Sequence, residues 1–394
     1  MKRSRFSRRN KHTPDTELLI RLCNNLVQSG SRLEDGFWEE RLTAAIERLL
    51  ADDEESPIMA ALDHLYGAGG RAYDALADMV EYCCETSIGD GGEAFTGGYD
   101  ALLIAAPVLA WSRYGIPSGP IAAEMLRNLR VQLQAHVLAR DARLALADFL
   151  FSPDQLPQSY PATASLTRRL TKVALHDRDL KIDAQQMAET VNFLSDTRYL
   201  LAVVAVPRGA PLFRWQEEDG SKQEALRQWR IQGGEALRPL LTACAMELHL
   251  PEAYHAATRE ADRVSRPYAV RAATAFLQTM FNITAADLRA VIAPFYDRSL
   301  EEYRIGFTLR NSHDVVHGIV WPLLFDEDEG SDVLSQIETT LREAGVHEVI
   351  VLDHRFPLEY CDDCGAPLYP DPDGEPVHAE LPEIDETITP RHLH

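Results

Sequence analysis

The sequence lacks an apolar segment long enough to cross a membrane. Its longest apolar run extends from Ala101 to Trp111 and contains Pro107, so it falls far short of the ~20 residues that a membrane-spanning helix needs. The N-terminus is basic, but an amphipathic segment with acidic residues follows it where a secretory signal would have an apolar core. We therefore expect neither a membrane span nor a secretory signal.

Cysteine is scarce as well. The chain of 394 residues has six cysteines, and two of them, Cys83 and Cys84, are adjacent. This number and arrangement exclude the regular disulfide framework that is typical of small secreted proteins. Together with the absence of a signal sequence, they predict a cytoplasmic protein.

The motifs of several common enzyme classes are missing. The sequence contains no phosphate-binding loop that ends in Gly-Lys-Ser/Thr, no His-Glu-x-x-His pair and no nucleophile elbow. No motif therefore indicates an enzyme class, and the sequence leaves open whether the protein is an enzyme.

Positive charge is scarce over most of the chain. Its 39 Lys and Arg residues face 61 Asp and Glu residues, which gives a net charge of −22, and a surface of this sign repels nucleic acid and anionic membranes. The first twelve residues are the exception, because they hold six of the basic residues: Lys2, Arg3, Arg5, Arg8, Arg9 and Lys11. This basic arm predicts contact with RNA, a ribosome or an acidic protein partner. The alternative is a disordered, solubilising tail.

The rest of the composition is that of a soluble globular protein. The chain is 45% apolar and 25% charged, and it is long enough for two or three domains. Residues 13–98 are predicted to be helical, because apolar residues recur at i, i+3 and i+4 in segments such as LLIRLCNNLV and LTAAIERLL.

Three segments of the chain resemble one another. They begin at Tyr99, Tyr199 and Tyr303 with an apolar run, and each carries a tryptophan further on. We interpret each start as two strands joined by a turn, followed by a helix and a third strand, which predicts three β-β-α-β repeats. Each repeat closes on a similar signature, namely Leu156-Pro157-x-x-Tyr160, Leu250-Pro251-x-x-Tyr254 and Phe356-Pro357-x-x-Tyr360.

These repeats set the predicted fold class, which is α/β with mixed α+β character. Helical connectors are expected after the first two repeats, and the second connector includes Ala285 to Phe295. Three copies could close into a pseudo-threefold ring or form a linear array, and the sequence does not decide between them. The predicted units are the basic arm 1–12, the helical region 13–98, repeat units with connectors at 99–198 and 199–302, a third repeat at 303–360, and a C-terminal hairpin with an acidic tail at 361–394.

A Cys-x-x-Cys motif follows the third closing signature. Cys361 and Cys364, with Gly365 behind them, have the spacing of a zinc knuckle, in which two sulfur atoms bind one ion from a tight turn. Tetrahedral zinc needs four ligands, and the nearest candidates for the other two are His354 and His378. The alternatives are a metal-free hairpin and a redox-active thiol pair, although acidic neighbours disfavour the latter.

Basic residues also recur after the first two closing signatures. Arg168 and Arg169 in the first connector and Arg259 and Arg263 in the second hold comparable positions. They could form an anion-binding site at the junctions between repeats. Alternatively, they only pair with the excess of acidic residues.

Three stretches resemble a family of uncharacterised bacterial proteins, domain of unknown function 2863. The stretches are MKRSRFSRR at the start, AAPVLAWSRYGIPSGPI at 105–121 and LEYCDDCGAPLYP at 358–370, and the resemblance covers the whole chain. It implies no activity, ligand or catalytic residue, because none is assigned to the family.

Two functional hypotheses remain from the sequence. The first is a cytoplasmic binding or regulatory scaffold with a zinc-stabilised C-terminal hairpin and a basic arm. The second is an enzyme that acts on a small anionic substrate at the junctions between repeats, with the recurring tyrosines and arginines. We favour the first, because catalytic sites gather polar groups in a pocket, whereas the repeated residues are mostly Tyr, Pro and Trp, which pack.

Overall fold

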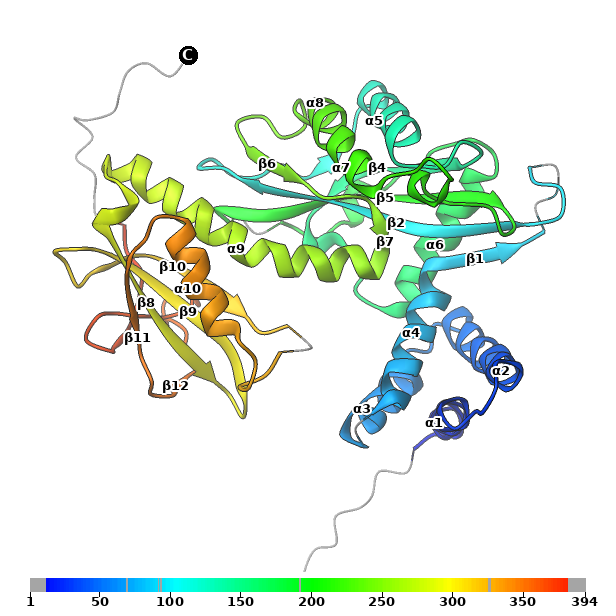
Figure 1. Cartoon of the computed structure of the whole chain (residues 1–394), viewed down its shortest axis with the longest axis horizontal. Helices are drawn as coiled ribbons and strands as arrows, with labels where there is room; N and C mark the ends of the chain where they lie inside the picture. The colour runs from blue at the N-terminus through cyan, green and yellow to red at the C-terminus, as the bar shows by residue number, and fades with distance from the viewer. Residues whose placement is uncertain are drawn as a thin grey trace, which may run out of the picture.

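The structure is a computed structural model that describes residues 12–68, 70–90, 92, 94–190, 193–324 and 327–381. The six basic residues of the N-terminal arm lie outside these ranges. Figure 1 shows three parts along the chain: a bundle of helices at the N-terminus, a central sheet covered by helices, and a smaller C-terminal sheet. The expected mixed α+β fold class is confirmed.

The N-terminal bundle contains four helices: α1 (Pro14–Val27), α2 (Arg32–Ala51), α3 (Ser56–Ala68) and α4 (Arg71–Glu85). Side chains cap the first two helices, since Thr13 accepts a hydrogen bond from the backbone N–H of Thr16, and Ser31 accepts one from that of Glu34. Apolar residues at helical spacing, such as Leu42, Ile46 and Leu49, form a core that is closed to solvent.

The central sheet consists of β1 (Thr86–Gly89), β2 (Tyr99–Trp111), β3 (Gly119–Pro120), β4 (Arg143–Phe151), β5 (Ser195–Pro207), β6 (Ala245–Leu248) and β7 (Glu252–Ala253). Its strand order is β1-β2-β5-β4-β3, and β6 and β7 also pair with β2. All of its named pairs are antiparallel. Because β5 lies between β2 and β4, the β2-α5-β4 segment is a split β-α-β unit.

Helices cover both faces of this sheet. Alternate residues of β2 point to opposite faces, so Ile104 joins one core with α5 (Ala123–His136), and Leu103 joins the other with α6 (Tyr160–Ala174). The first core also includes α8 (Gly234–Leu237) and the π-helical turn Trp229–Gly233, which continues α7 (Lys222–Gln228).

The long helix α9 (Tyr254–Phe281) joins the central sheet to the C-terminal sheet. Its first half contributes Ala257 and Ala261 to the core of the central sheet, whereas its second half contributes Ala273 and Leu277 to the core of the C-terminal sheet. Pro267 lies inside the helix, between the two halves. Figure 1 shows α9 running from one sheet to the other.

The C-terminal sheet has the order β10-β9-β8-β11, with β12 beside β8. Its elements are β8 (Leu288–Tyr296), β9 (Leu300–Leu309), β10 (Val315–Pro322), α10 (Val333–Glu343), β11 (Glu348–Val351) and β12 (Phe356–Pro357). A short hairpin, β13 (Tyr369–Pro370) and β14 (Pro376–Val377), follows. Short 3₁₀ turns lie at Pro153–Gln155, Ala184–Gln186, Arg214–Gln216 and Ala285–Asp287.

The threefold repeat of β-β-α-β units is not confirmed. The segment at Tyr303 is a hairpin as expected, but the segments at Tyr99 and Tyr199 lie in single uninterrupted strands, β2 and β5. These two strands pair with each other, and Tyr99 is opposite Pro207 while Tyr199 is opposite Pro107. The residues that the first two segments share therefore meet across one strand pair, whereas the third segment belongs to another sheet.

Pro107 lies inside β2, within the segment where the sequence predicted two strands joined by a turn. A proline lacks the backbone N–H of a sheet ladder, and it is tolerated where no partner is needed. On this edge of β2, β7 pairs only with residues 104–105 and β6 only with residues 108–111. The carbonyl of Pro107 accepts from His249 N at 3.0 Å on the same edge, so its nitrogen faces the gap between two short strands.

The predicted helix from Ala285 to Phe295 is also wrong. After one 3₁₀ turn, this segment is the strand β8, which pairs with β9 on one side and with β11 on the other. Its run of residues with almost no exposed surface suits a strand that is covered on both faces. Among the described residues, no helix has the length and apolar content that a membrane crossing requires.

Candidate functional site

The Cys-x-x-Cys motif and His378 come together in the structure. The ligand atoms of Cys361, Cys364 and His378 all lie within 4.8 Å of one another, and Sγ of Cys364 is 3.3 Å from Nε2 of His378. Two thiolates and an imidazole are a ligand set that zinc uses in proteins. This group could hold a metal ion.

A tight turn positions the two cysteines. The carbonyl of Cys361 accepts a hydrogen bond from Gly365 N at 2.8 Å, and its own N–H donates to the Ala366 carbonyl at 2.7 Å. Gly365 has a φ of +72°, which glycine adopts without steric cost. Backbone N–H groups of Cys364 and Asp363 point at the Cys361 sulfur and lower its pKa, so they favour the thiolate that binds metal.

The β13–β14 hairpin delivers His378 from the other side. Tyr369 pairs with Val377, and the Asp371 carboxylate accepts a hydrogen bond from Glu375 N at 2.8 Å within the turn. His378 follows Val377 directly, and its Nδ1 lies 3.8 Å from Oε1 of Glu380. A carboxylate behind a metal-binding histidine orients its ring.

A buried arginine fixes both halves of this site to the sheet. Arg304 on β9 is completely closed to solvent and donates to the carbonyls of Glu359 and Leu368 at 2.6 and 2.8 Å. Glu302 balances its charge through a hydrogen bond of 2.6 Å. The chain segments just before and just after the knuckle are therefore held by one guanidinium group.

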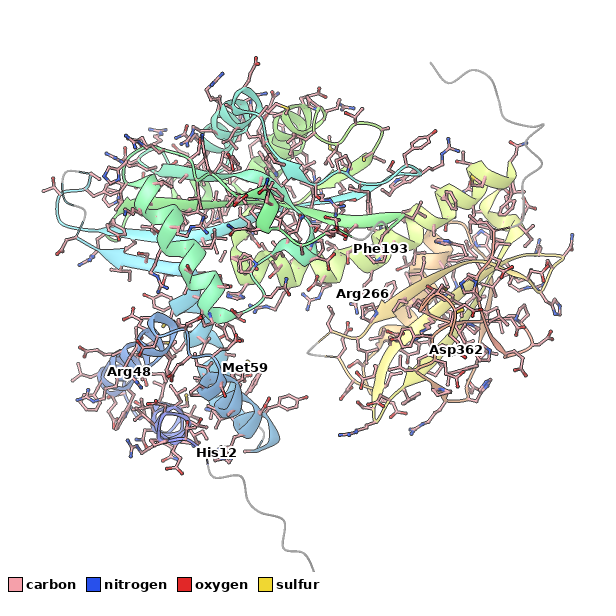
Figure 2. All side chains as sticks on the ribbon, turned by 180° about the vertical axis from the view of Figure 1, so that it is seen from behind. His12, Arg48, Met59, Phe193, Arg266 and Asp362 are labelled. Atoms are coloured by element: carbon pink, nitrogen blue, oxygen red, sulfur yellow. The ribbon has the colours of Figure 1, made fainter. Side chains whose placement is uncertain are left out.

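Two facing glycines make room for the hairpin. Gly306 and Gly318 are paired across β9 and β10, and a Cβ atom would lie 2.2 Å from the Pro370 carbonyl oxygen at the first and 2.4 Å from the Tyr369 ring at the second. The hairpin thus lies directly on the sheet backbone. The knuckle, whose Asp362 is labelled in Figure 2, is consequently an integral part of the C-terminal unit.

His354, the other predicted zinc ligand, does not belong to this group among the described residues. Its ring packs against Phe356 with 4.1 Å between ring centroids, and it also contacts the turn at Gly374. The described ligand set is therefore Cys361, Cys364 and His378. Burial raises the pKa of the other four cysteines, to about 12 for Cys23 and Cys83, and this disfavours their thiolate form.

The four predicted anion-binding arginines do not form one site. Arg259 and Arg263 on α9 line one cavity, whereas Arg169 on α6 lines another. Arg168, the residue before Arg169, is exposed. Arg259 is paired with Glu81 of the N-terminal bundle. Arg263 lies 3.3 Å from Glu260.

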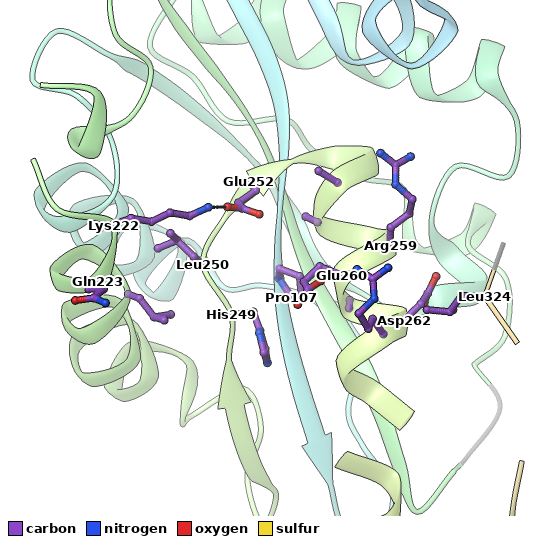
Figure 3. A pocket seen from close by; sticks show the side chains of 15 residues that line it. Pro107, Lys222, Gln223, His249, Leu250, Glu252, Arg259, Glu260, Asp262 and Leu324 are labelled. Carbon is purple, nitrogen blue, oxygen red and sulfur yellow. Dashed lines mark hydrogen bonds and ion pairs between the residues drawn. The ribbon is translucent and has the colours of Figure 1, made fainter. Parts of the chain in front are cut away.

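The cavity of Arg259 and Arg263, called the arginine cavity here, has a volume of about 910 Å³. Figure 3 shows that its wall combines cations and anions, with Lys222 bonded to Glu252 at one end. His249 also lines it, and burial lowers the pKa of this histidine. The charges of the wall therefore largely compensate one another.

A second cavity, the tyrosine cavity, lies at the start of both α6 and α9. Its volume is about 520 Å³. Its wall includes two closing tyrosines of the predicted repeats, Tyr160 and Tyr254, together with Tyr199, His255, Glu55 and Asp262. The third closing tyrosine, Tyr360, is elsewhere: it is half exposed and lies against Arg304. The predicted arginines and tyrosines therefore do not converge on one cavity.

His255 and Glu85 are notable residues that the sequence did not single out. The His255 backbone N–H donates to Oε2 of Glu85 at 3.0 Å, and the ring nitrogen Nε2 is buried without a partner among the described residues. Burial lowers the pKa of His255 to about 4 and raises that of Glu85 to about 7. The only sequence signal was the histidine that follows the second closing tyrosine.

Fold and site together define a mixed α+β protein with a candidate metal site in its C-terminal unit. Residues 4–392 match the family described as Protein of unknown function (DUF2863), and the chain belongs to this family. No curated protein and no solved structure matches the chain.

Proposed function

We propose that the protein is a cytoplasmic binding or regulatory protein whose C-terminal unit carries a zinc ion. The observation that carries this proposal is the convergence of Cys361, Cys364 and His378 from two segments that are both anchored on the sheet. Because the ligands are held in place before metal arrives, little conformational freedom is lost when an ion binds. A stable metal site is the expected result.

The ligand types favour zinc over harder ions. Thiolate sulfur and imidazole nitrogen suit zinc, whereas magnesium and calcium prefer oxygen ligands. Three protein ligands leave one position of a tetrahedron open. A water molecule or a group from a binding partner would fill it, which agrees with a role in binding.

Metal analysis of the purified protein tests the proposal. We expect about one zinc ion per chain, and the variant Cys361→Ser should lose it. Cys244→Ser is the matched control, since Cys244 is partly buried against the central sheet and should not affect zinc content. His354→Ala should also retain zinc. Native protein that is free of metal would refute the proposal.

We propose further that the basic arm contacts RNA or an acidic partner. The support is its charge, because the arm concentrates basic residues on a chain with a net charge of −22. Deletion of residues 1–12 should abolish co-sedimentation with ribosomes or RNA. Exchange of the six basic residues for glutamine should have the same effect, and unchanged sedimentation in both variants would exclude this role.

A second candidate is an enzyme for a small anionic substrate in the arginine cavity. Lys222, Arg259 and Arg263 line that cavity, which favours an anion. Each of these cations already has an acidic partner, and this ranks the candidate second. Inorganic phosphate should raise the melting temperature of the native protein and not that of Arg263→Gln, if the candidate is correct.

A further inference from the structure

The tyrosine cavity is formed by three parts of the chain that are distant in sequence. Glu55 and Met59 come from the N-terminal bundle, Tyr160 from the start of α6, and Tyr254 and His255 from the start of α9. Its volume of about 520 Å³ lies within the range of small-molecule sites. It is a preformed cavity at the junction of the bundle and the central sheet.

Four aromatic rings, those of Tyr160, Tyr199, Tyr254 and His255, belong to its wall. Tyr199 and Tyr254 are only 2% and 4% exposed, so their positions are fixed by packing. The His255 ring lies edge-on to Tyr254 with 5.0 Å between centroids and 6.2 Å from the Tyr160 ring. The faces of such rings carry negative electrostatic potential and attract organic cations.

The charges in this wall are all negative. Glu55 and Asp262 line the cavity, and no lysine or arginine is among the described residues that do. One oxygen of Glu55 already accepts from Tyr160 N at 2.8 Å, which fixes the carboxylate at the start of α6. The carboxylate of Asp262 has no hydrogen bond or ion pair within the described part of the chain, so it can accept a hydrogen bond from a ligand. Burial raises its pKa, and the charge of nearby Arg266, which is itself paired with Glu327, acts in the opposite direction.

His255 does not offset this charge. Its Nε2 atom is buried without a partner among the described residues, and burial next to Arg259 lowers its pKa to about 4. The imidazole is therefore neutral at neutral pH. The cavity therefore has the acidic side chains of Glu55 and Asp262 beside aromatic rings, and no basic side chain lines it among the described residues.

We propose that the tyrosine cavity binds a small organic cation with one or more ammonium groups. Asp262 and Glu55 would accept hydrogen bonds from the ammonium group, and the tyrosine rings would surround its carbon-bound part. This chemistry differs from that of the arginine cavity, whose wall has three basic side chains. The proposal is also independent of the metal site, which lies in the C-terminal unit.

Isothermal titration calorimetry of the full chain tests this inference. The probes are spermidine, putrescine and tetramethylammonium, and inorganic phosphate serves as the anionic comparison. We expect saturable binding of at least one cation at physiological salt and no competition by phosphate. Asp262→Asn should weaken binding by about tenfold or more.

Glu260→Gln is the matched control. Glu260 lies on the same helix as Asp262, and its exchange for glutamine removes the same charge as Asp262→Asn. Glu260 lines the arginine cavity and not the tyrosine cavity. Tyr254→Phe should bind nearly as well as the native chain because it keeps the ring, whereas Tyr254→Leu should bind several-fold more weakly. Circular dichroism checks that each variant is folded.

Three outcomes would overturn the inference. They are the absence of saturable binding for all three cations, equal weakening by Glu260→Gln and Asp262→Asn, and displacement of the cation by phosphate. Equal weakening would mean that the cation only follows the net negative charge of the protein. Cys361→Ser should bind the cation normally, so that failure of the zinc proposal and failure of this one can be told apart.

Discussion

Glu85 and His255 meet where α4 packs against the start of α9, and their pKa values are shifted in opposite directions. Burial raises the pKa of Glu85 from 4.5 to about 7, and the neighbouring Glu81 adds to this rise. Burial lowers the pKa of His255 from 6.5 to about 4, and Arg259 adds to this fall. Each residue therefore gives the stability of the protein a different dependence on pH.

The two contributions depend on pH with opposite signs. Folded protein holds the Glu85 proton more tightly than unfolded protein between about pH 4.5 and 7, so this contribution to the free energy of unfolding decreases as pH rises. Unfolded protein holds the His255 proton more tightly between about pH 4 and 6.5, so this contribution increases with pH. In the native chain the two contributions oppose each other.

Single substitutions should separate them. Relative to the native chain, Glu85→Gln should become more stable as pH rises from 5 to 7, and His255→Gln should become less stable over the same interval. The slope of each difference should be on the order of 1 kcal/mol per pH unit. Urea unfolding at pH 5, 6 and 7 measures it, and parallel pH profiles for all three chains would contradict the assignment.

At the scale of single residues, the sequence predicted part of the candidate metal site. The spacing of Cys361 and Cys364 and the nearby His378 were sufficient to name three residues that come together and could hold a metal ion, because a knuckle is formed locally. His354 was closer in sequence to the cysteines than His378, but its ring packs on Phe356 instead. The contact between Glu85 and His255 could not be predicted from the sequence. The two residues are 170 positions apart, and their contact depends on how α4 and α9 pack together.

At the scale of elements, helices were predicted better than strands. The N-terminal helices follow from capping residues and i, i+3, i+4 spacing, both of which act within a few residues. The hairpins predicted at Tyr99 and Tyr199 were wrong, because these segments lie in the single strands β2 and β5, and β2 continues through Pro107. Its tolerance in β2 depends on the gap between β6 and β7, and this gap belongs to another part of the chain.

The end of α9 gives a prediction at the same scale. Asn282 follows the helix with a φ of 53°, a left-handed conformation that asparagine adopts more readily than β-branched residues. Asn282→Gly should leave stability unchanged or raise it slightly, whereas Asn282→Val should lower the free energy of unfolding by about 1–2 kcal/mol. Urea unfolding measures both.

A control for this prediction lies one turn earlier. Thr279 is exposed and helical, so Thr279→Val should change stability by only about 0.5 kcal/mol. Equal losses for Asn282→Val and Thr279→Val would show that the left-handed position has no special cost.

At the scale of the whole molecule, α9 connects the three parts. Arg259 near its start pairs with Glu81 of the bundle, and Arg266, labelled in Figure 2, binds Glu327 beyond β10 through hydrogen bonds of 2.6 and 2.9 Å. Arg266 is almost fully buried, and it also donates to the Pro322 carbonyl at 3.0 Å. The proposed metal site lies on the opposite face of the C-terminal sheet from α9, because Arg304 and Gly306 of β9 meet the hairpin whereas Ile305 and Phe307 pack in the core with α9.

Removal of the metal should therefore have a local effect. After treatment with a chelator, amide hydrogen exchange should become faster in residues 358–381, where the knuckle and hairpin lie. Exchange in α1 to α4 should stay the same, because the bundle has its own core. Faster exchange throughout the chain, or none in residues 358–381, would contradict this view of the metal as a clamp on the C-terminal unit.

Asp262 belongs to the walls of both cavities beside α9. An ammonium group that neutralised this carboxylate would remove a repulsive charge from the neighbouring arginine cavity, so an anion would bind there more tightly. By thermodynamic reciprocity, the anion would strengthen cation binding by the same factor. One shared aspartate would thus make the two compartments cooperative, and a molecule with both charges could occupy them together.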